Sequence, residues 1–218
     1  MPLLAIESST EHCGVALEVN GEVLERHTVE PRAHASLILP WCQALLAEAE
    51  LSFSQLDGLT VSRGPGGFTS LRIGLGIVQG LALAHDHPVY PVSSLDALAL
   101  NIDPAGQQAH LIALLDARMD EVYWAAYQGR NHRPVRLGDE HLSQPDSLAL
   151  PAQAQWQLAG PGALAYADRL RQALGSSVLI LEQAFWPTAP ALLTLAREVE
   201  PVAGHTLSPS YLRDQVTG

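Results

Sequence analysis

The N-terminal region of the chain contains the stretch LLAIESSTEHCGVALEVNG at residues 3–21. Its first four residues are apolar and end at Glu7, residues 14–19 alternate, and Asn20-Gly21 is a two-residue hairpin signal. Residues 22–29 continue the same meander. We therefore predict a buried strand that ends in an acid, followed by an antiparallel hairpin.

Helices and parallel strands are predicted to follow this meander. The spacing of apolar residues predicts a helix over 34–50, with Pro40 inside it, and a second helix over 68–85. A buried strand over 56–62 leads into a glycine-rich loop at 63–67. A further strand is expected at 89–92, and a short helix capped by serine at 93–100. Alternation of strands and helices predicts an α/β fold.

The second half of the chain resembles the first. Residues 110–115 are apolar and end at Asp116, residues 122–127 alternate, and Gly129 turns the chain. The acid lies 14 residues before the turn glycine in the first half and 13 in the second. This spacing suggests a duplication, and two unrelated meanders are the alternative. We place the boundary near Pro104-Ala105-Gly106, which gives lobes 1–104 and 105–218.

Composition excludes several chemistries. All 12 basic residues are arginine, so the chain has no lysine for a nucleotide phosphate or a Schiff base. The net charge is −11 and the sequence pI about 5.1, which is unfavourable for holding RNA alone. Cys13 and Cys42 are expected to be reduced thiols in the cytoplasm. The N-terminus lacks a basic leader, and the apolar stretch 73–84 is too short to span a membrane.

Two groups of residues could form a nucleotide cleft. Glu7 and Asp116 end their strands, with Ser9 and Arg118 beside them, and acids so placed can hold a magnesium–nucleotide complex. There are two alternatives to a nucleotide cleft. The acids could simply be solvated strand ends, or Asp116 could form an ion pair with Arg118 that holds a hairpin. The loop at 63–67 could hold an anion at the start of the next helix, or it could be a tight turn that allows close packing.

No catalytic or metal site is predicted. His85 and His87 form a close pair, but two ligands do not complete a metal site. Ser8 or Ser9 could be combined with His34 and Asp116 into a triad, yet the sequence has no Gly-x-Ser-x-Gly elbow.

The two long helices are unusually apolar. Between Phe68 and Ala84 the long polar side chains are Arg72 and Gln79, and a helix that is apolar all round must be buried on both sides. The two helices could bury each other, or they could form an interface with a second protein. We expect a partner interface on helices 34–48 and 68–84, formed by His34, Leu37, Ile38, Trp41, Leu45, Leu71, Arg72, Leu75, Gly76, Val78, Gln79 and Gly80.

Several motifs, taken in order along the chain, resemble one bacterial family. They are LAIESST at 4–10, RGPGGFT at 63–69 with LRIG at 71–74, QGLA at 79–82, DAR at 116–118 with EVY at 121–123, and SPSYLR at 208–213. This set is similar to the TsaB family, also called YeaZ, of accessory proteins in tRNA threonylcarbamoyladenosine synthesis. The resemblance runs nearly end to end, although Ser70 stands where the family usually has glycine.

The resemblance implies a duplicated actin-like ATPase fold of the ribonuclease H-like class, with two βββαβα-type lobes. It implies binding to the transferase TsaD, with TsaE joining the pair, a homodimer when the chain is alone, and contact with tRNA only through the complex. It also implies no catalysis, because residues 93–98 replace the metal-binding histidine pair of TsaD with Ser-Ser-Leu-Asp-Ala-Leu. No cofactor of its own is expected, although ATP or ADP could lie at the complex interface. An independent nucleotide-dependent kinase or hydrolase, and a protease acting on TsaD, are the alternatives.

Overall fold

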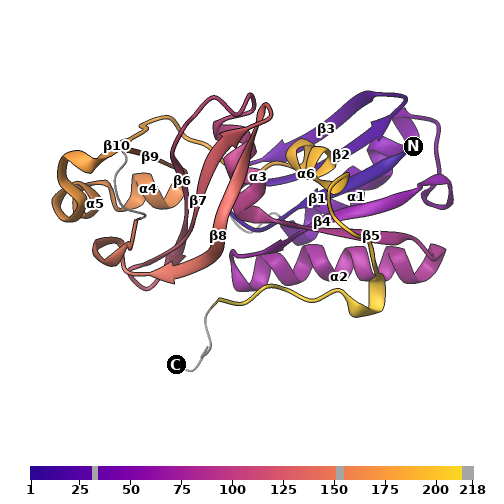
Figure 1. Ribbon diagram of the computed structural model, residues 1–218. Helices are drawn as coiled ribbons and strands as arrows, with labels where there is room; N and C mark the ends of the chain where they lie inside the picture. The colour runs from indigo at the N-terminus through magenta and orange to yellow at the C-terminus, as the bar shows by residue number, and fades with distance from the viewer. Residues whose placement is uncertain (31–33, 151–154, 213–218) are drawn as a thin grey trace. The chain divides into compact units, whose positions relative to one another are not determined.

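The computed structural model describes residues 1–30, 34–150 and 155–212. The chain forms two compact units (Figure 1). The first contains Met1–Ala97 and Pro187–Ser210, and the second is built on Leu98–Trp186. The first unit therefore takes up a segment from near the C-terminus, whereas the sequence predicted a division into 1–104 and 105–218.

The first unit has a mixed sheet. Its strands are β1 (Leu3–Glu7), β2 (Cys13–Val19), β3 (Glu22–Thr28), β4 (Gly58–Gly64), β5 (Pro88–Ser93) and β11 (Val202–Ala203). The strand order is β11-β5-β4-β1-β2-β3. The β1-β2-β3 meander is antiparallel, whereas β4 pairs parallel to both β1 and β5. The short strand β11 pairs antiparallel with β5, and this pairing ties the C-terminal segment to the first unit.

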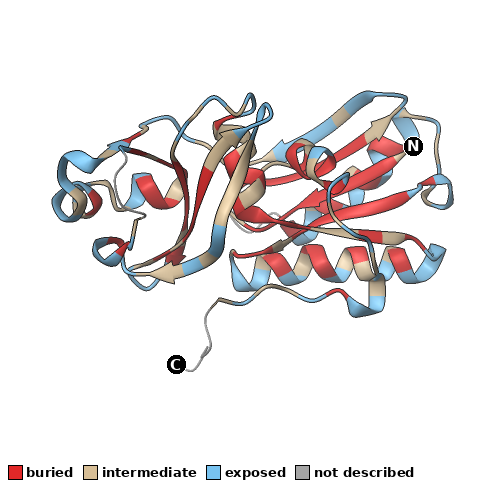
Figure 2. Ribbon diagram, viewed as in Figure 1, coloured by how far each residue is buried: buried red, intermediate tan, exposed pale blue. Residues whose placement is uncertain are grey.

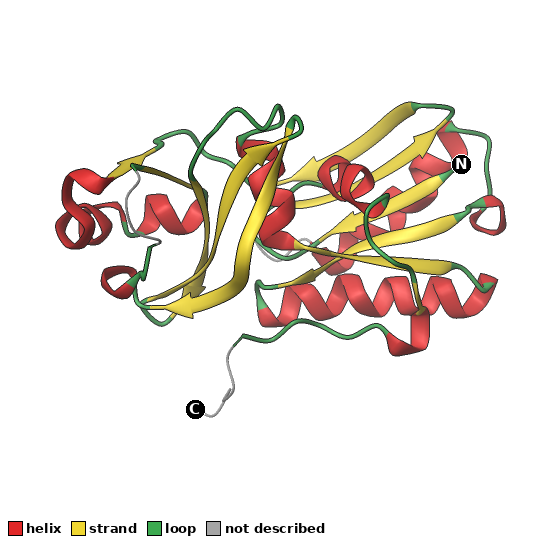
Figure 3. Cartoon of the chain, viewed as in Figure 1, coloured by secondary structure: helices red, strands yellow, loops and turns green. Residues whose placement is uncertain are grey.

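Helices cover both faces of this sheet (Figure 3). Helices α1 (His34–Glu48) and α2 (Phe68–His85) pack on one face, and α6 (Ala189–Ala196) packs on the other. Successive side chains of β1 point to opposite faces of the sheet, and so they meet different helices. Leu4 and Ile6 share a core cluster with α1 and α2, whereas Leu3 faces the end of α6. A one-turn helix, η1 (Phe53–Gln55), precedes β4, and η4 (Gly204–Thr206) follows β11.

The second unit repeats this plan in reduced form. Strands β6 (Leu111–Arg118), β7 (Glu121–Arg130), β8 (Arg133–Ser143), β9 (Trp156–Ala159) and β10 (Val178–Ile180) are ordered β10-β9-β6-β7-β8. Helices α4 (Pro161–Ala165) and α5 (Ala167–Leu174) follow β9, and the one-turn helix η3 (Gly175–Ser177) precedes β10. Between β8 and β9, where the first unit has α1, the residues described form only the single turn η2 (Pro145–Ser147).

The two sheets share one topology. In each sheet the first three strands form an antiparallel meander. The fourth strand pairs parallel to the first, and the fifth pairs parallel to the fourth, which gives the order 3-2-1-4-5. The duplicated plan predicted from the sequence is confirmed. Buried residues lie along the central strands and on the inner sides of the helices (Figure 2). Helix α3 (Ser94–Ile102) follows β5, and the hydroxyl of Ser93 accepts hydrogen bonds from the N–H groups of Leu95 and Asp96, as expected of a serine cap.

Candidate functional site: an exposed helix face beside a sealed polar cluster

The end of β1 carries a sealed carboxyl group. The Glu7 side chain has no exposed surface, and its Oε1 accepts hydrogen bonds from the backbone N–H and the hydroxyl of Ser9, at 2.6 and 2.5 Å. Burial raises the pKa of Glu7 to about 7, although the hydrogen bonds from Ser9 act in the opposite direction. The alternative of a solvated strand end is therefore wrong for Glu7. A nucleotide-binding role for Glu7 and Ser9 stays a prediction.

The corresponding acid of the second unit has different surroundings. The Asp116 carboxylate forms an ion pair with Arg118, with 3.0 Å between Nη1 and Oδ2, and its Oδ1 accepts the backbone N–H of Arg118 at 2.8 Å. The ion pair that the sequence offered as the alternative to a nucleotide cleft is thus present, and a nucleotide-binding role for Asp116 and Arg118 stays a prediction. The hydroxyl of Tyr166 also donates to Oδ1 at 3.3 Å. Tyr166 could not be found from sequence, because it lies 50 residues from Asp116 and belongs to no recognisable motif.

The glycine-rich loop is held against the end of β1. The N–H of Gly67 donates to the Ser9 carbonyl oxygen at 2.8 Å, and a Cβ on Gly66 would overlap that same oxygen. The glycines therefore allow two backbones to approach closely, which supports the packing interpretation of this loop. Because the Gly67 N–H is already bonded within the chain, it is not available to an anion.

The residues predicted to contact a partner fall into three sets. Arg72, Gly76 and Gly80 are exposed, and Leu37, Trp41 and Gln79 are half-buried. The other six lie in the core of the first unit, because α1 and α2 pack on the sheet and against each other: His34, Ile38, Leu45, Leu71, Leu75 and Val78. The prediction that these six residues contact a partner directly is therefore corrected, because other residues of the same chain already cover their side chains.

Helix α2 leaves one apolar face open to solvent. Phe68, Arg72, Gly76, Gly80 and Leu83 follow one another at helical spacing, and we call these five residues the α2 outer face. Leu83 is 85% exposed and Phe68 49%. The Arg72 guanidinium lies over the Phe68 ring, 3.3 Å from its centroid. The sequence prediction missed Phe68 and Leu83, although their helical spacing from Gly76 and Gly80 was a usable signal.

The two glycines make this face flat. A Cβ on Gly76 or Gly80 would meet nothing within 4 Å, so neither glycine is needed for packing within the chain. Glycine within a helix costs up to about 1 kcal/mol relative to alanine. In addition, α2 contains no acidic residue, although the chain carries 23 acids against 12 bases. The α2 outer face is therefore a flat, nearly uncharged surface on an acidic protein.

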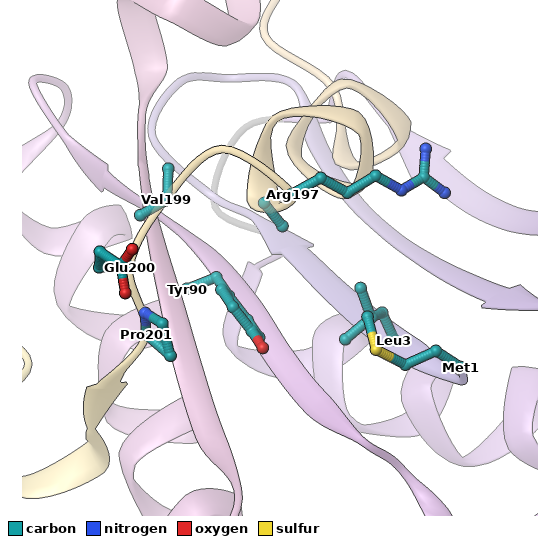
Figure 4. Close-up of a pocket in the computed structure, with 8 residues that line it drawn as sticks. Met1, Leu3, Tyr90, Arg197, Val199, Glu200 and Pro201 are labelled. Atoms are coloured by element: carbon teal, nitrogen blue, oxygen red, sulfur yellow. The ribbon is translucent and has the colours of Figure 1, made fainter.

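A shallow hollow of about 360 Å³ lies at the opposite end of the parallel strands from Glu7 (Figure 4). Tyr90 occupies its centre, Leu3 and Met1 lie on one side, and Val199, Glu200 and Pro201 lie on the other. The Arg197 side chain points away from the hollow and forms an ion pair with Glu18. Its lining combines apolar side chains with the Tyr90 hydroxyl and the Glu200 carboxylate.

Neither a metal site nor a membrane span is found in the described ranges. No three His, Cys, Asp or Glu side chains gather there as a metal-binding group. In the His85–His87 pair, His87 Nε2 lies 2.7 Å from the Phe53 carbonyl oxygen, so this ring nitrogen is used within the chain. Over the same ranges, no helix has both the length and the hydropathy needed to cross a membrane.

Two consecutive sheets of the order 3-2-1-4-5 define a duplicated actin-like ATPase fold of the ribonuclease H-like class. The model of the family described as "TsaD: tRNA N6-adenosine threonylcarbamoyltransferase" matches residues 25–178. Curated proteins named tRNA threonylcarbamoyladenosine biosynthesis protein TsaB match almost the whole chain at 35–37% identity, so the chain belongs to the TsaB family, also called YeaZ.

Relatives of known name cover the whole chain. The tRNA threonylcarbamoyladenosine biosynthesis protein TsaB of Haemophilus influenzae is 37% identical, over 100% of this chain and 95% of its own length. The protein of the same name from Escherichia coli is 35% identical, over 99% and 96%. The solved structure of YeaZ from Pseudomonas aeruginosa aligns with a TM-score of 0.86 at 39% identity, covering 97% of this chain and 99% of that one.

Proposed function

We propose that this chain is a non-catalytic subunit in the synthesis of threonylcarbamoyladenosine on tRNA, at the adenosine next to the anticodon in tRNAs that read codons starting with A. It binds and activates the transferase TsaD through the α2 outer face, and TsaE joins the assembled pair. The names of the relatives support the pathway. The single observation that supports the docking surface is the exposed apolar face of α2.

The energetics favour a protein partner at this face. Burial of apolar surface contributes about 25 cal/mol per Å², so covering the exposed rings and methyl groups of Phe68 and Leu83 favours association. Gly76 and Gly80 allow the backbone of another helix to come close. Arg72 is the one charged residue of the α2 outer face, so few charges have to be desolvated on binding. The same face would pair with a second copy when TsaD is absent, which gives a homodimer with a symmetric interface.

Two local features fit a role without catalysis. Ser93, the first residue of the stretch 93–98 that the resemblance sets against the metal-binding histidine pair of TsaD, caps helix α3 with its hydroxyl. Glu7 is sealed behind Ser9 and has no exposed surface. The chain would thus act by stabilising the active arrangement of TsaD, with any ATP or ADP bound at the complex interface.

Substitutions at Gly80 test the docking surface. Gly80→Arg places a long charged side chain on the α2 outer face, so we expect affinity for TsaD to fall at least 100-fold, while the circular dichroism spectrum stays unchanged and the temperature of thermal unfolding is not lowered. The remote surface variant Gln172→Arg, which adds the same charge at an exposed position of α5, is the matched control and should bind normally. The binding assay is isothermal titration with purified TsaD. Formation of threonylcarbamoyladenosine in a mixture with TsaD, TsaE, the adenylate-forming enzyme and tRNA gives the functional readout.

Full affinity of Gly80→Arg for TsaD would refute this docking surface. Leu75→Glu would not be a clean test of the same idea, because Leu75 is 3% exposed and belongs to the core beneath the face. A charge at that position would unfold the first unit, so loss of binding would carry no information about the interface.

A further inference from the structure

The C-terminal segment of the first unit runs alongside helix α2 (Figure 1). We call residues 204–210 the strap. At one end Gly204 packs against α2 so closely that a Cβ there would lie 2.7 Å from the Cβ of Ala82. At the other end the N–H of Ser210 donates to the Arg63 carbonyl oxygen at 2.7 Å, next to the glycine-rich loop. The strap therefore spans most of the length of α2.

A side-chain hydrogen bond joins the middle of the strap to the helix. Gln79 Nε2 donates to the Leu207 carbonyl oxygen at 2.9 Å, across 128 residues of sequence. The Leu207 side chain is 5% exposed and lies in the core cluster of the first unit. Gln79 was predicted to contact a partner directly, but its side-chain amide is used within the chain.

Gln79 lies at the edge of the α2 outer face. It directly precedes Gly80 and is one helical turn from Gly76 and Leu83. Buried residues such as Leu75 and Val78 hold α2 on the sheet, and half-buried Ile73 and Ile77 pack in the same core as α1. The strap covers the remaining flank. Helix α2 is thus supported on every side except the outer face.

We propose that Gln79 is a positioning residue: it ties the strap to α2, and the strap holds the outer face in the orientation that binds the partner. This inference rests on the proposed function. Preorganisation of a surface lowers the entropic cost of binding, so releasing one flank of the helix weakens association without removing any contact. The role needs a donor at position 79, because the Leu207 carbonyl oxygen can only accept.

The closing experiment compares two variants of Gln79 in the full chain. Gln79→Met keeps the length and neutrality of the side chain but removes the donor, whereas Gln79→Lys keeps a donor. Amide hydrogen exchange over 204–212 and 68–85 reports the strap and the helix, and titration with TsaD reports affinity. We expect Gln79→Met to raise exchange in both segments at least tenfold and to weaken binding about fivefold to tenfold. Gln79→Lys should restore both.

Gly204→Val separates positioning from direct contact. This substitution pushes the strap off Ala82 at a point outside the α2 outer face, so it should weaken TsaD binding to a similar extent. Normal affinity of Gly204→Val despite faster exchange in the strap would overturn the inference, and so would normal affinity of Gln79→Met. If the wild-type chain itself failed to bind TsaD, the proposed function would fall and the positioning role with it, so the wild-type arm distinguishes the two failures.

Discussion

The carboxyl group of Glu7 accepts two hydrogen bonds from one neighbour, Ser9, whose N–H and hydroxyl both reach Oε1. The arrangement is sealed from solvent, and burial raises the pKa of Glu7 from 4.5 to about 7. Between these two values the folded chain keeps a proton that the unfolded chain has released. The contribution of Glu7 to stability is therefore fully present below pH 4.5 and is lost as the pH rises through 7.

We expect Glu7→Gln to remove this pH dependence. An amide at position 7 keeps an acceptor oxygen for Ser9 and carries no charge at any pH. The difference in free energy of unfolding between the variant and the wild type should therefore change by about 3 kcal/mol between pH 4.5 and pH 8, in favour of the variant at high pH. Urea unfolding at four pH values measures it. If the free energy of unfolding changed with pH in the same way for the two proteins, Glu7 would ionise normally in the folded state.

His12 is expected to make stability depend on pH in the opposite direction. Burial lowers the pKa of His12 from 6.5 to about 4, and the charge of His27, whose ring stacks on it with 5.1 Å between centroids, acts in the same direction. The unfolded chain binds the proton more readily, so the contribution of His12 to stability is present above pH 6.5 and is lost as the pH falls towards 4.

We predict that His12→Asn reduces the loss of stability at acid pH. The variant should lose less stability than the wild type between pH 6.5 and pH 4, and combining it with Glu7→Gln should remove both slopes. Thermal unfolding in buffers of constant ionic strength tests the expectation, with His205→Asn at an exposed position as the control. If the control changed the slope as much as His12→Asn, the effect would not come from burial.

The duplicated α/β plan was predictable because it depends on short-range patterns. A strand that ends in an acid, followed by a hairpin glycine, occurs twice in the sequence, and the structure contains two sheets of the same order. The assignment of Pro187–Ser210 to the first unit was not predictable, since it depends on the pairing of β11 with β5. That pairing joins segments more than a hundred residues apart and has no local signal.

The candidate site was predictable only at the level of the helices. An apolar sequence over 68–84 indicates that α2 is covered on several sides, but it does not say which residues face the core. The structure places Leu75 inside and Gly80 outside, because only the register of α2 on the sheet decides between them. Gln79 could equally have met a partner, and its bond to Leu207 becomes visible only in three dimensions.

Gly66 and Gly76 should respond in opposite ways to replacement by alanine. Gly66→Ala forces a Cβ onto the Ser9 carbonyl oxygen, a backbone atom that cannot move freely, so we expect a loss of about 2–4 kcal/mol in the free energy of unfolding. Gly76→Ala meets open space in a helix and should stabilise the chain by up to about 1 kcal/mol. Urea denaturation at pH 7 measures both. A stable Gly66→Ala variant would show that the loop does not need this close approach.

The arginines of the second unit test how the chain relates to tRNA. Arg130 and Arg133 are exposed, whereas Arg136 is half-buried and forms an ion pair with Glu140. A test of RNA contact therefore uses Arg130→Gln together with Arg133→Gln and leaves Arg136 in place. In a chain with a net charge of −11, two side chains on one hairpin do not make a phosphate-binding surface.

We expect this double variant, assembled with TsaD and TsaE, to bind tRNA within about twofold of the wild-type complex, because phosphate binding needs clustered basic side chains and this chain has a net charge of −11. Fluorescence anisotropy with labelled tRNA at two salt concentrations measures both the affinity and its salt dependence. Each lost phosphate contact reduces the slope of log K against log salt by about 1. A slope reduced by about 2, with a large loss of affinity, would instead place the β7–β8 hairpin directly on the RNA.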